Sequence, residues 1–377
     1  MSPTSWRSRP PSERAILAGL KTKGPQGSHE EELTELKLLA ETAGAQVRGA
    51  VLQRRGPIKA ATFLSKGKIA EVRALSAEEQ ATLLLLDEDL SPAQSRNLGE
   101  ELEMKIVDRT GLILDIFSRR ARTREARLQV ELAQLEYLLP RLTRMWEHLS
   151  RLGGGIGTRG PGETQLEVDR RRVRERIAKL KRELGRVVKE RRVQRRRRRD
   201  CFKVSLVGYT NAGKSTLFNA LTRANVYVED QLFATLDPTT RAFGMGPNGR
   251  ALLTDTVGFI RKLPPHLVAS FRATLEEVAE ADLLLHVVDA TEPDIDARIE
   301  AVEGVLESIG AHERPRVLVF NKIDLVSDEV SALGLRARYP GAIFVSALAR
   351  IGLPELREAT MARLLEERNG GPDSPTP

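Results

Sequence analysis

The stretch Gly208-Tyr209-Thr210-Asn211-Ala212-Gly213-Lys214-Ser215 decides the fold of the second half of this 377-residue chain. It matches the phosphate-loop pattern G-x-x-x-x-G-K-[ST], which would arise by chance in such a chain about one time in a hundred. The β-rich run Lys203–Val207 precedes it, and the helical segment Lys214–Thr222 follows it. The backbone N–H groups of such a loop converge on a β-phosphate, and the helix N-terminus adds its positive dipole. We expect Lys214 to reach the β- and γ-phosphates and the Ser215 hydroxyl to bind Mg²⁺.

Further apolar runs follow the loop along the chain. They cover Ala251–Thr254, Leu283–Val288, Val317–Phe320 and Ile343–Val345, and helical segments lie between most of them. Near-continuous apolar strands of this length are typical of a parallel sheet covered on both faces. His286 lies inside one run, and we interpret it as a packed core residue rather than a ligand.

Three short motifs follow three of these strands, where α/β folds place their ligands. In Asp255-Thr256-Val257-Gly258 we expect an Mg²⁺-linked Asp and a Gly that senses the γ-phosphate. In Asn321-Lys322-Ile323-Asp324 a carboxylate can accept hydrogen bonds from guanine N1–H and the exocyclic amine. Adenine has no such donor pair and would leave the carboxylate unpaired. Ser346-Ala347-Leu348 can present a backbone N–H to guanine O6. The four motifs in this order predict a GTPase.

The rest of the chain divides by composition and period. A helical stripe at Leu33, Leu36, Leu39 and Ala40 is followed by alternating strand and helix signals, which predict a small, mainly parallel α/β domain. Residues 1–28 and 369–377 are rich in Pro, Ser and Gly without periodicity, and we expect disordered tails there. The predicted organisation is therefore a tail over 1–28, an α/β domain over 29–120, a helical hairpin over 121–200, a G domain over 201–368 and a tail over 369–377.

The hairpin prediction comes from two apolar seams. Their residues alternate spacings of four and three, which is the a/d pattern of a coiled coil. Six glycines lie among residues 153–162 and cannot continue a helix, so two antiparallel helices should meet there, with Arg151 and Arg159 at the tip. Pro140 should bend the first helix. The seams consist of Leu128, Leu132, Leu135, Leu139, Leu142, Trp146 and Leu149, and of Val173, Ile177, Leu180, Leu184 and Val187.

The net charge of +8 is concentrated in one segment. Residues 170–199 hold 17 Lys or Arg and three Asp or Glu, and they end in the run Arg195–Arg199. Such a density exceeds what solubility requires and favours contact with nucleic acid over an anionic membrane surface. The single cysteine, Cys201, excludes an intramolecular disulfide framework. No apolar run is long enough to cross a membrane and no signal-peptide h-region precedes the first domain, so we expect a cytoplasmic protein.

The chain resembles the HflX family of translational GTPases, and the resemblance, which rests on four stretches, covers nearly all of the ordered chain. The resemblance implies an N-terminal family-specific domain, a helical hairpin and a Ras-like G domain that binds GTP and GDP. It also implies that the protein binds the large ribosomal subunit and splits or rescues ribosomes under stress. One departure from the family is that the chain stops soon after Glu367, without the extra C-terminal domain that some members carry, which leaves the function of that domain open here. The stretches are D-R-T-G-L-I-L-D-I-F at Asp108–Phe117, R-T-R-E-A at Arg122–Ala126, Q-V-E-L-A-Q-L at Gln129–Leu135 and G-G-G-I-G-T-R-G-P-G-E-T-Q-L-E at Gly153–Glu167.

The resemblance also selects the switch threonine. From spacing alone Thr235, Thr239 and Thr240 are all candidates for closing over Mg²⁺ and the γ-phosphate. The segment Phe233-Ala234-Thr235-Leu236-Asp237-Pro238 is similar to the family's switch segment, which implies Thr235. The expected catalytic set is then Lys214, Thr235 and Gly258, and the expected metal ligands are Ser215 and Thr235. Phe233, Ala234, Leu236 and Asp237 join the expected nucleotide-binding residues.

Two positions bear on the rate of hydrolysis. Many Ras-like GTPases have a water-orienting Gln where this chain has Phe259, so we expect slow hydrolysis by the isolated protein. Asn211 could serve as a K⁺ ligand or simply cap the loop. The predicted partner is the large ribosomal subunit and its RNA, contacted through the hairpin and residues 170–199 by a monomer, with peripheral membrane contact as the lesser option. The alternative function is a GTP-regulated RNA-binding assembly scaffold whose hydrolysis is incidental.

Overall fold

The computed structural model describes residues 13–21, 31–54, 61–143, 165–196, 201–222, 224, 231–244, 250–262, 264, 272–326 and 329–370. By their contacts these residues form two compact units. One contains residues up to Arg119 together with Gln134–Ile177, and the other contains Arg120–Ala133 together with residues from Ala178 onward. Each unit is an α/β structure with its own sheet, as the sequence predicts. The domain boundaries given above stay predictions.

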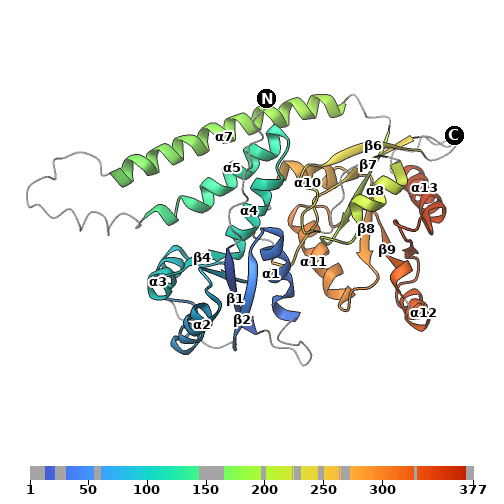
Figure 1. Ribbon diagram of the computed structural model, residues 1–377. Helices are drawn as coiled ribbons and strands as arrows, with labels where there is room; N and C mark the ends of the chain where they lie inside the picture. Colours follow the sequence, from blue (N-terminus) through green and yellow to red (C-terminus); the bar gives the residue numbers. More distant parts are fainter. Residues whose placement is uncertain are drawn as a thin grey trace, which may run out of the picture. The chain divides into compact units, whose positions relative to one another are not determined.

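The N-terminal unit is built on a four-stranded, entirely parallel sheet of order β2-β1-β3-β4. Helices α2 and α3 pack on one face with Ile16 and Leu84, and α1 lies against the opposite face (Figure 1). The stripe Leu33, Leu36, Leu39 and Ala40 is buried, as its helical spacing predicts. The strands are β1 (Arg14–Lys21), β2 (Gln46–Arg54), β3 (Leu83–Leu86) and β4 (Lys105–Asp108), and the helices are α1 (Glu31–Thr42), α2 (Lys66–Glu79) and α3 (Pro92–Leu102).

Strand β1 corrects one expectation. We expected residues 1–28 to be disordered, yet Arg14–Lys21 pairs with both β2 and β3 and its central residues are buried. Its apolar run is short and lies between Pro- and Ser-rich flanks, so no local periodicity marked it as a strand. Pairing on both sides with distant segments stabilises it. Residues 1–12 and 22–28 lie outside the described part.

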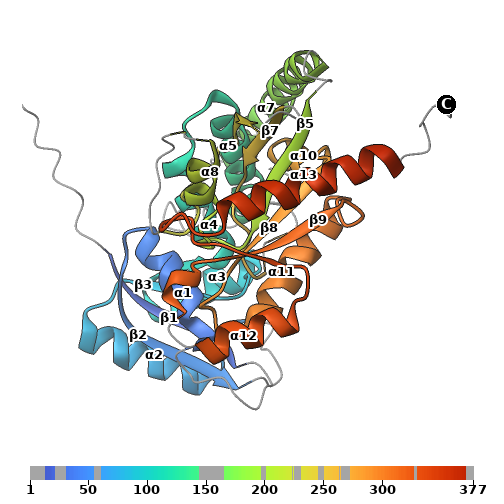
Figure 2. The same ribbon diagram turned by 90° about the vertical axis from the view of Figure 1, so that its right-hand side faces the viewer.

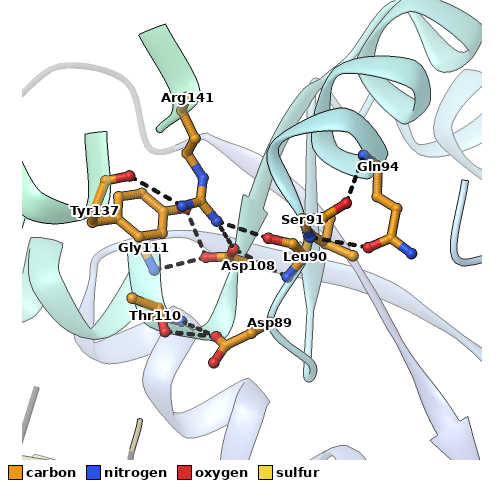
Figure 3. A network of polar contacts seen from close by, with 9 residues as sticks. All are labelled: Asp89, Leu90, Ser91, Gln94, Asp108, Thr110, Gly111, Tyr137 and Arg141. Carbon is orange, nitrogen blue, oxygen red and sulfur yellow. Dashed lines mark hydrogen bonds and ion pairs between the residues drawn. The ribbon is translucent and has the colours of Figure 1, made fainter. Parts of the chain in front are cut away.

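A polar network holds the end of this sheet to the base of the predicted hairpin (Figure 3). Asp108, at the end of β4, is 1 % exposed and accepts hydrogen bonds from Gly111 N, Tyr137 Oη and Arg141 Nη2 at 2.9, 2.7 and 2.7 Å. Burial is the main reason that the pKa of Tyr137 lies above its usual range, and the charge of Asp108 raises it further. Helices α4 (Arg109–Arg120) and α5 (Arg124–Leu138) are thus connected to the sheet by one buried carboxylate.

The helical region differs from the prediction at Pro140. We expected a bend, but α5 ends at Leu138, and a short 3₁₀ turn at Arg141–Thr143 follows. Proline disfavours helical geometry in the residue before it, which accounts for the early end. The second long helix is α7 (Gln165–Arg196), whose seam residues Val173, Ile177, Leu180, Leu184 and Val187 are buried or half-buried. The tip loop with Arg151 and Arg159, and the side chains of Arg195–Arg199, lie outside the described part.

The second unit is a six-stranded sheet of order β10-β9-β8-β5-β7-β6, parallel except for the edge strand β6. Helices α8 and α13 pack on one face, and α11 and α12 pack on the other (Figures 1 and 2). This is the doubly covered parallel sheet that the apolar runs predict. The strands are β5 (Phe202–Gly208), β6 (Thr239–Gly244), β7 (Arg250–Asp255), β8 (Leu283–Asp289), β9 (Arg316–Asn321) and β10 (Ile343–Phe344). The helices are α8 (Lys214–Thr222), α10 (Arg272–Ala279), α11 (Ile295–Ser308), α12 (Glu329–Arg338) and α13 (Leu353–Gly370).

Two expectations outside the site can be compared with the fold. His286 on β8 is 2 % exposed, and burial lowers its pKa to about 3, so it is a neutral core residue. In the part of the chain that the structure describes, no helix is long and apolar enough to cross a membrane.

Candidate functional site

The phosphate-binding loop connects β5 to α8. Gly213 has a φ of +84°, and a Cβ at this position would lie 2.3 Å from Asn321 Nδ2, so only glycine fits. Asn321 donates from Nδ2 to Ala212 O (3.0 Å) and accepts at Oδ1 from Ala347 N (3.0 Å). One side chain of the expected base motif thereby holds the loop and the Ser346-Ala347-Leu348 motif together.

Lys214 is the buried cation of the loop. It is 6 % exposed, and its Nζ donates to the carbonyl oxygens of Gly208 (3.1 Å) and Tyr209 (2.7 Å). Burial lowers its pKa from 10.5 to about 8, and the nearby Asp255 carboxylate partly opposes that shift. Backbone oxygens thus position the ammonium, but burial removes the water that would stabilise its charge. An anionic ligand would stabilise that charge instead.

Three oxygen-bearing side chains meet at the carboxyl end of β7. Ser215 Oγ donates to Asp255 Oδ2 (2.6 Å) and lies 2.8 Å from Thr235 Oγ1, which itself donates to Asp255 Oδ2 (3.1 Å). Asp255 is fully buried, and burial raises its pKa although the Ser215, Lys214 and Thr235 contacts oppose the rise. Its Oδ1 is buried and has no hydrogen-bond partner among the described residues. Of the three threonines left open by spacing, Thr235 is the one in this cluster.

Gly258 and Phe259 lie directly beside the phosphate loop. A Cβ on Gly258 would be 2.8 Å from Thr210 Cα and 2.9 Å from Lys214 Nζ, so a larger residue would displace the lysine. Phe259 N donates to Gly208 O (3.1 Å), and Phe259 O accepts from Thr210 N (2.7 Å). Phe259 is 1 % exposed and its ring packs in the interior, so its side chain does not reach the cleft.

The phosphate loop, the switch segment and the Gly258 turn surround an open cleft. Most of its lining consists of expected site residues. Sequence reasoning missed Thr216 and Gln231 in this lining. Thr216 directly follows the loop motif and could have been included with it, whereas Gln231 belongs to no motif. The lining consists of Thr210, Asn211, Gly213, Lys214, Ser215, Phe233, Ala234, Thr235, Thr256 and Gly258 with Thr216 and Gln231.

Other expected residues contribute from behind the cleft or point elsewhere. Tyr209 does not line the cleft, and the Arg298 guanidinium lies 4.0 Å above its ring. Thr256 is part of the lining, but its Oγ1 donates to Leu206 O (2.6 Å). Leu236 and Val257 are buried apolar side chains. Asp237 does not line the cleft, because its carboxylate accepts hydrogen bonds from the backbone N–H groups of Arg122 and Thr123.

The expected base motifs lie side by side at the ends of β9 and β10. Asp324 is exposed and Ser346 is fully buried, with its Oγ accepting from Ala349 N (2.9 Å). Lys322 has a left-handed backbone (φ +64°) and forms an ion pair with Asp289 (2.6 Å). Sequence reasoning missed Asp289, although it directly follows an apolar strand and could have been found on that ground. Leu348 is 81 % exposed.

A parallel sheet covered on both faces, a phosphate-binding loop and three motifs at the carboxyl ends of β7, β9 and β10 define a Ras-like P-loop GTPase. Known proteins agree. A family model described as "GTP-binding GTPase N-terminal" matches residues 30–118, one described as "GTP-binding GTPase Middle Region" matches 120–198, and one described as "50S ribosome-binding GTPase" matches 203–322.

Close relatives cover almost the whole chain. GTPase HflX of Caldanaerobacter subterraneus subsp. tengcongensis is 53% identical over 94% of this chain and 81% of the relative, and GTPase HflX of Escherichia coli is 49% identical over 94% and 84%. A GTP-binding protein from the archaeon Sulfolobus solfataricus, solved in complex with GDP, is 27% identical over 94% of this chain and 99% of that one, with a TM-score of 0.46. The chain belongs to the HflX family, and it is a GTP-binding, GTP-hydrolysing enzyme.

Proposed function

We propose that the cleft binds Mg²⁺–GTP in a state in which Thr235 is docked beside Ser215 and Asp255. The observation that carries the proposal is the buried Asp255 Oδ1, which has no partner among the described residues, on a carboxylate whose Oδ2 accepts from the Ser215 and Thr235 hydroxyls. Buried polar atoms without a partner are rare and call for an explanation, and a hard cation with its waters would supply one. The residues present fit Mg²⁺. Ser215 and Thr235 would hold it and Asp255 would accept from its water, and the ion would neutralise charge on the β- and γ-phosphates.

The remaining expected residues divide between phosphates and base. Lys214 and the backbone N–H groups of Gly208–Ser215 would contact the phosphates. The backbone of Gly258 would lie beside the γ-phosphate, because the absence of a Cβ lets it approach Lys214 closely. Asn321, Lys322, Ile323, Asp324 and the Ser346-Ala347-Leu348 loop would hold guanine, with Asp324 supplying the specificity.

Asn211 supports a role for K⁺. It lines the cleft in a left-handed conformation (φ +63°), and its side chain makes no hydrogen bond to the described residues. The simple capping role that we considered as the alternative therefore has no support within that part of the chain. A K⁺ near the phosphates would stabilise charge that develops during hydrolysis.

We infer a ribosomal partner from the charge of α7. Basic residues outnumber acidic ones by 17 to three over residues 170–199, and Arg171, Arg172, Arg174 and Arg176 are exposed on the helix. The pairs Arg171–Glu175 (4.0 Å) and Arg172–Asp169 (3.7 Å) are long and open to solvent, so they neutralise little of this charge. A basic helix of this kind fits RNA phosphates. With the family membership, this supports a cytoplasmic monomer that binds the large ribosomal subunit through α7 and the hairpin and splits or rescues ribosomes.

The experiment is a GTPase assay with purified large subunits, joined to light scattering of intact ribosomes. We expect strong stimulation of hydrolysis and a GTP-dependent fall in scattering. Binding without stimulation would favour the assembly scaffold with incidental hydrolysis, which the same basic helix would also serve. Recruitment to anionic liposomes with no affinity for subunits would overturn the ribosomal assignment.

A further inference from the structure

The two residues that precede α5 are bound by a carboxylate from the switch segment. Asp237 Oδ2 accepts from Arg122 N (3.0 Å) and Thr123 N (3.2 Å), and its Oδ1 accepts from Thr123 Oγ1. Thr123 Oγ1 in turn accepts from Ala126 N (3.1 Å) in the first turn of the helix. A carboxylate at a helix N-terminus is a strong cap because it satisfies unpaired N–H groups and opposes the helix dipole. Here the cap comes from 114 residues further along the chain.

A second contact joins the same two segments. The Arg120 guanidinium, at the end of α4, donates to Gln231 Oε1. Gln231, two residues before the switch segment, and Asp237 within it therefore both bind Arg120–Thr123. The stretch between them contains Ala234 and Thr235, which line the cleft. All of these residues belong to the same compact unit.

The geometry couples the two ends of this connection. Thr235 and Asp237 are two residues apart, so their Cα atoms are at most about 7 Å from each other. A hydrogen bond breaks when its heavy atoms separate beyond about 3.5 Å. If Thr235 leaves Ser215 and Asp255, the Asp237 carboxylate is therefore displaced from α5 unless the intervening backbone absorbs the whole movement.

We propose that Asp237 is a positioning residue that fixes Thr235 in its docked state and reports that state to α5. The carboxylate does not line the cleft, and it acts through Thr235 and the first turn of α5. The inference rests on the proposed role of Thr235 and adds a direction of regulation. Coupling between two sites is reciprocal, so a partner that holds α5 in its capped position also favours docking of Thr235.

The test compares turnover in variants on both sides of the contact. Asp237→Ala should lower kcat about tenfold with little change in the KM for GTP, because the phosphate loop and the base motifs are untouched. Asp237→Asn keeps one acceptor oxygen and should fall in between. Thr123→Val removes one of the three hydrogen bonds to Asp237, together with the acceptor for Ala126 N, and should lower kcat in the same direction, with a less than additive effect in the double variant.

The matched control is Asp294→Ala. Asp294 Oδ1 caps α11 by accepting from Ala297 N (3.3 Å), so its removal also uncaps a helix of this unit, but kcat should stay at the wild-type value. A second readout is hydrogen exchange of the Arg122–Ala126 amides. It should be slower with a non-hydrolysable GTP analogue than with GDP in the wild type, and equal in Asp237→Ala.

Two outcomes separate the failures. If Asp237→Ala keeps the wild-type kcat while Thr235→Ala loses activity, the positioning role of Asp237 is overturned and the proposed nucleotide site stands. If Thr235→Ala keeps the wild-type kcat, both the proposed Mg²⁺–GTP site and the positioning role of Asp237 are overturned.

Discussion

Lys214 shows at the scale of one residue how burial prepares a binding group. Its pKa is about 8, and burial is the main cause. The folded-state pKa lies below the unfolded value, so this group contributes stability above pH 10.5 that declines as the pH falls through 8. Phosphates favour the charged form, so binding raises the pKa again.

The predicted consequence is proton uptake on binding. Above pH 8 the GTP complex should take up a proton, and the association constant should fall by up to about tenfold per pH unit. Calorimetry between about pH 7 and 9 in buffers of different ionisation enthalpy measures both quantities. Lys214→Arg stays charged throughout and is the control, since the comparison cancels titration of the nucleotide. Equal slopes in the two proteins would contradict the prediction.

Asp324 carries the second prediction at this scale. Asp324→Asn places an N–H₂ donor against guanine donors and should weaken GTP binding about a hundredfold or more. Xanthosine triphosphate has a C2 carbonyl that accepts this donor, so its affinity should rise in the variant. Competition of both nucleotides against a fluorescent analogue tests the exchange. Unchanged GTP affinity would remove Asp324 from the base site.

At the scale of elements, one buried carboxylate connects β4, α4, α5 and the 3₁₀ turn (Figure 3). Asp108→Ala should destabilise the N-terminal unit by about 3 kcal/mol, because Tyr137 and Arg141 would be left without this acceptor. Hydrogen exchange of the Leu83–Leu86 amides reports on that unit. The control is Asp115→Ala, whose exposed pair with Arg119 should contribute about 0.5 kcal/mol or less. Equal destabilisation by the two substitutions would show that the network is not structural.

Helix α7 and the residues that follow it carry the next prediction. Changing Arg195–Arg199 to Gln should weaken binding to large subunits and flatten its dependence on salt. The log–log slope should become shallower by about 0.7–0.9 for each phosphate that is no longer neutralised. Nucleotide affinity should not change. Arg363→Gln, on α13 and paired with Glu366, should leave the slope as it is. If the variant with Gln at Arg195–Arg199 has the same salt slope as Arg363→Gln, these arginines are only a solvated surface and do not contact RNA.

At the scale of the whole molecule, slow hydrolysis follows from how Phe259 is held. Its backbone bonds to the phosphate loop and its ring is buried, so the isolated protein has no water-orienting side chain at that position. The isolated protein should hydrolyse GTP slowly, and large subunits should stimulate hydrolysis by ordering the segment around Thr235. Rates in K⁺ and Na⁺, with and without subunits, test both parts. Fast hydrolysis without subunits would contradict slow switching, and equal rates in both salts would contradict only the K⁺ role.

Much of the architecture could be predicted because its signals are local. A phosphate loop needs its glycines, Lys214 and Ser215 close together in the chain, and buried parallel strands such as β3 and β8 show as continuous apolar runs. The order of the motifs then places them at one edge of the sheet. Family resemblance selected Thr235, where spacing left three candidates open.

Only the tertiary structure decided the features that depend on contacts between distant residues. Strand β1 exists because β2 and β3 pair with it, and α5 ends before Pro140 rather than bending through it. The family resemblance placed Asp237 among the expected nucleotide-binding residues, yet its carboxylate binds Arg122 and Thr123, which precede α5 in a distant part of the chain. Local patterns determine which groups can bind phosphate, whereas burial and pairing at long range determine which of those groups remain free to do so.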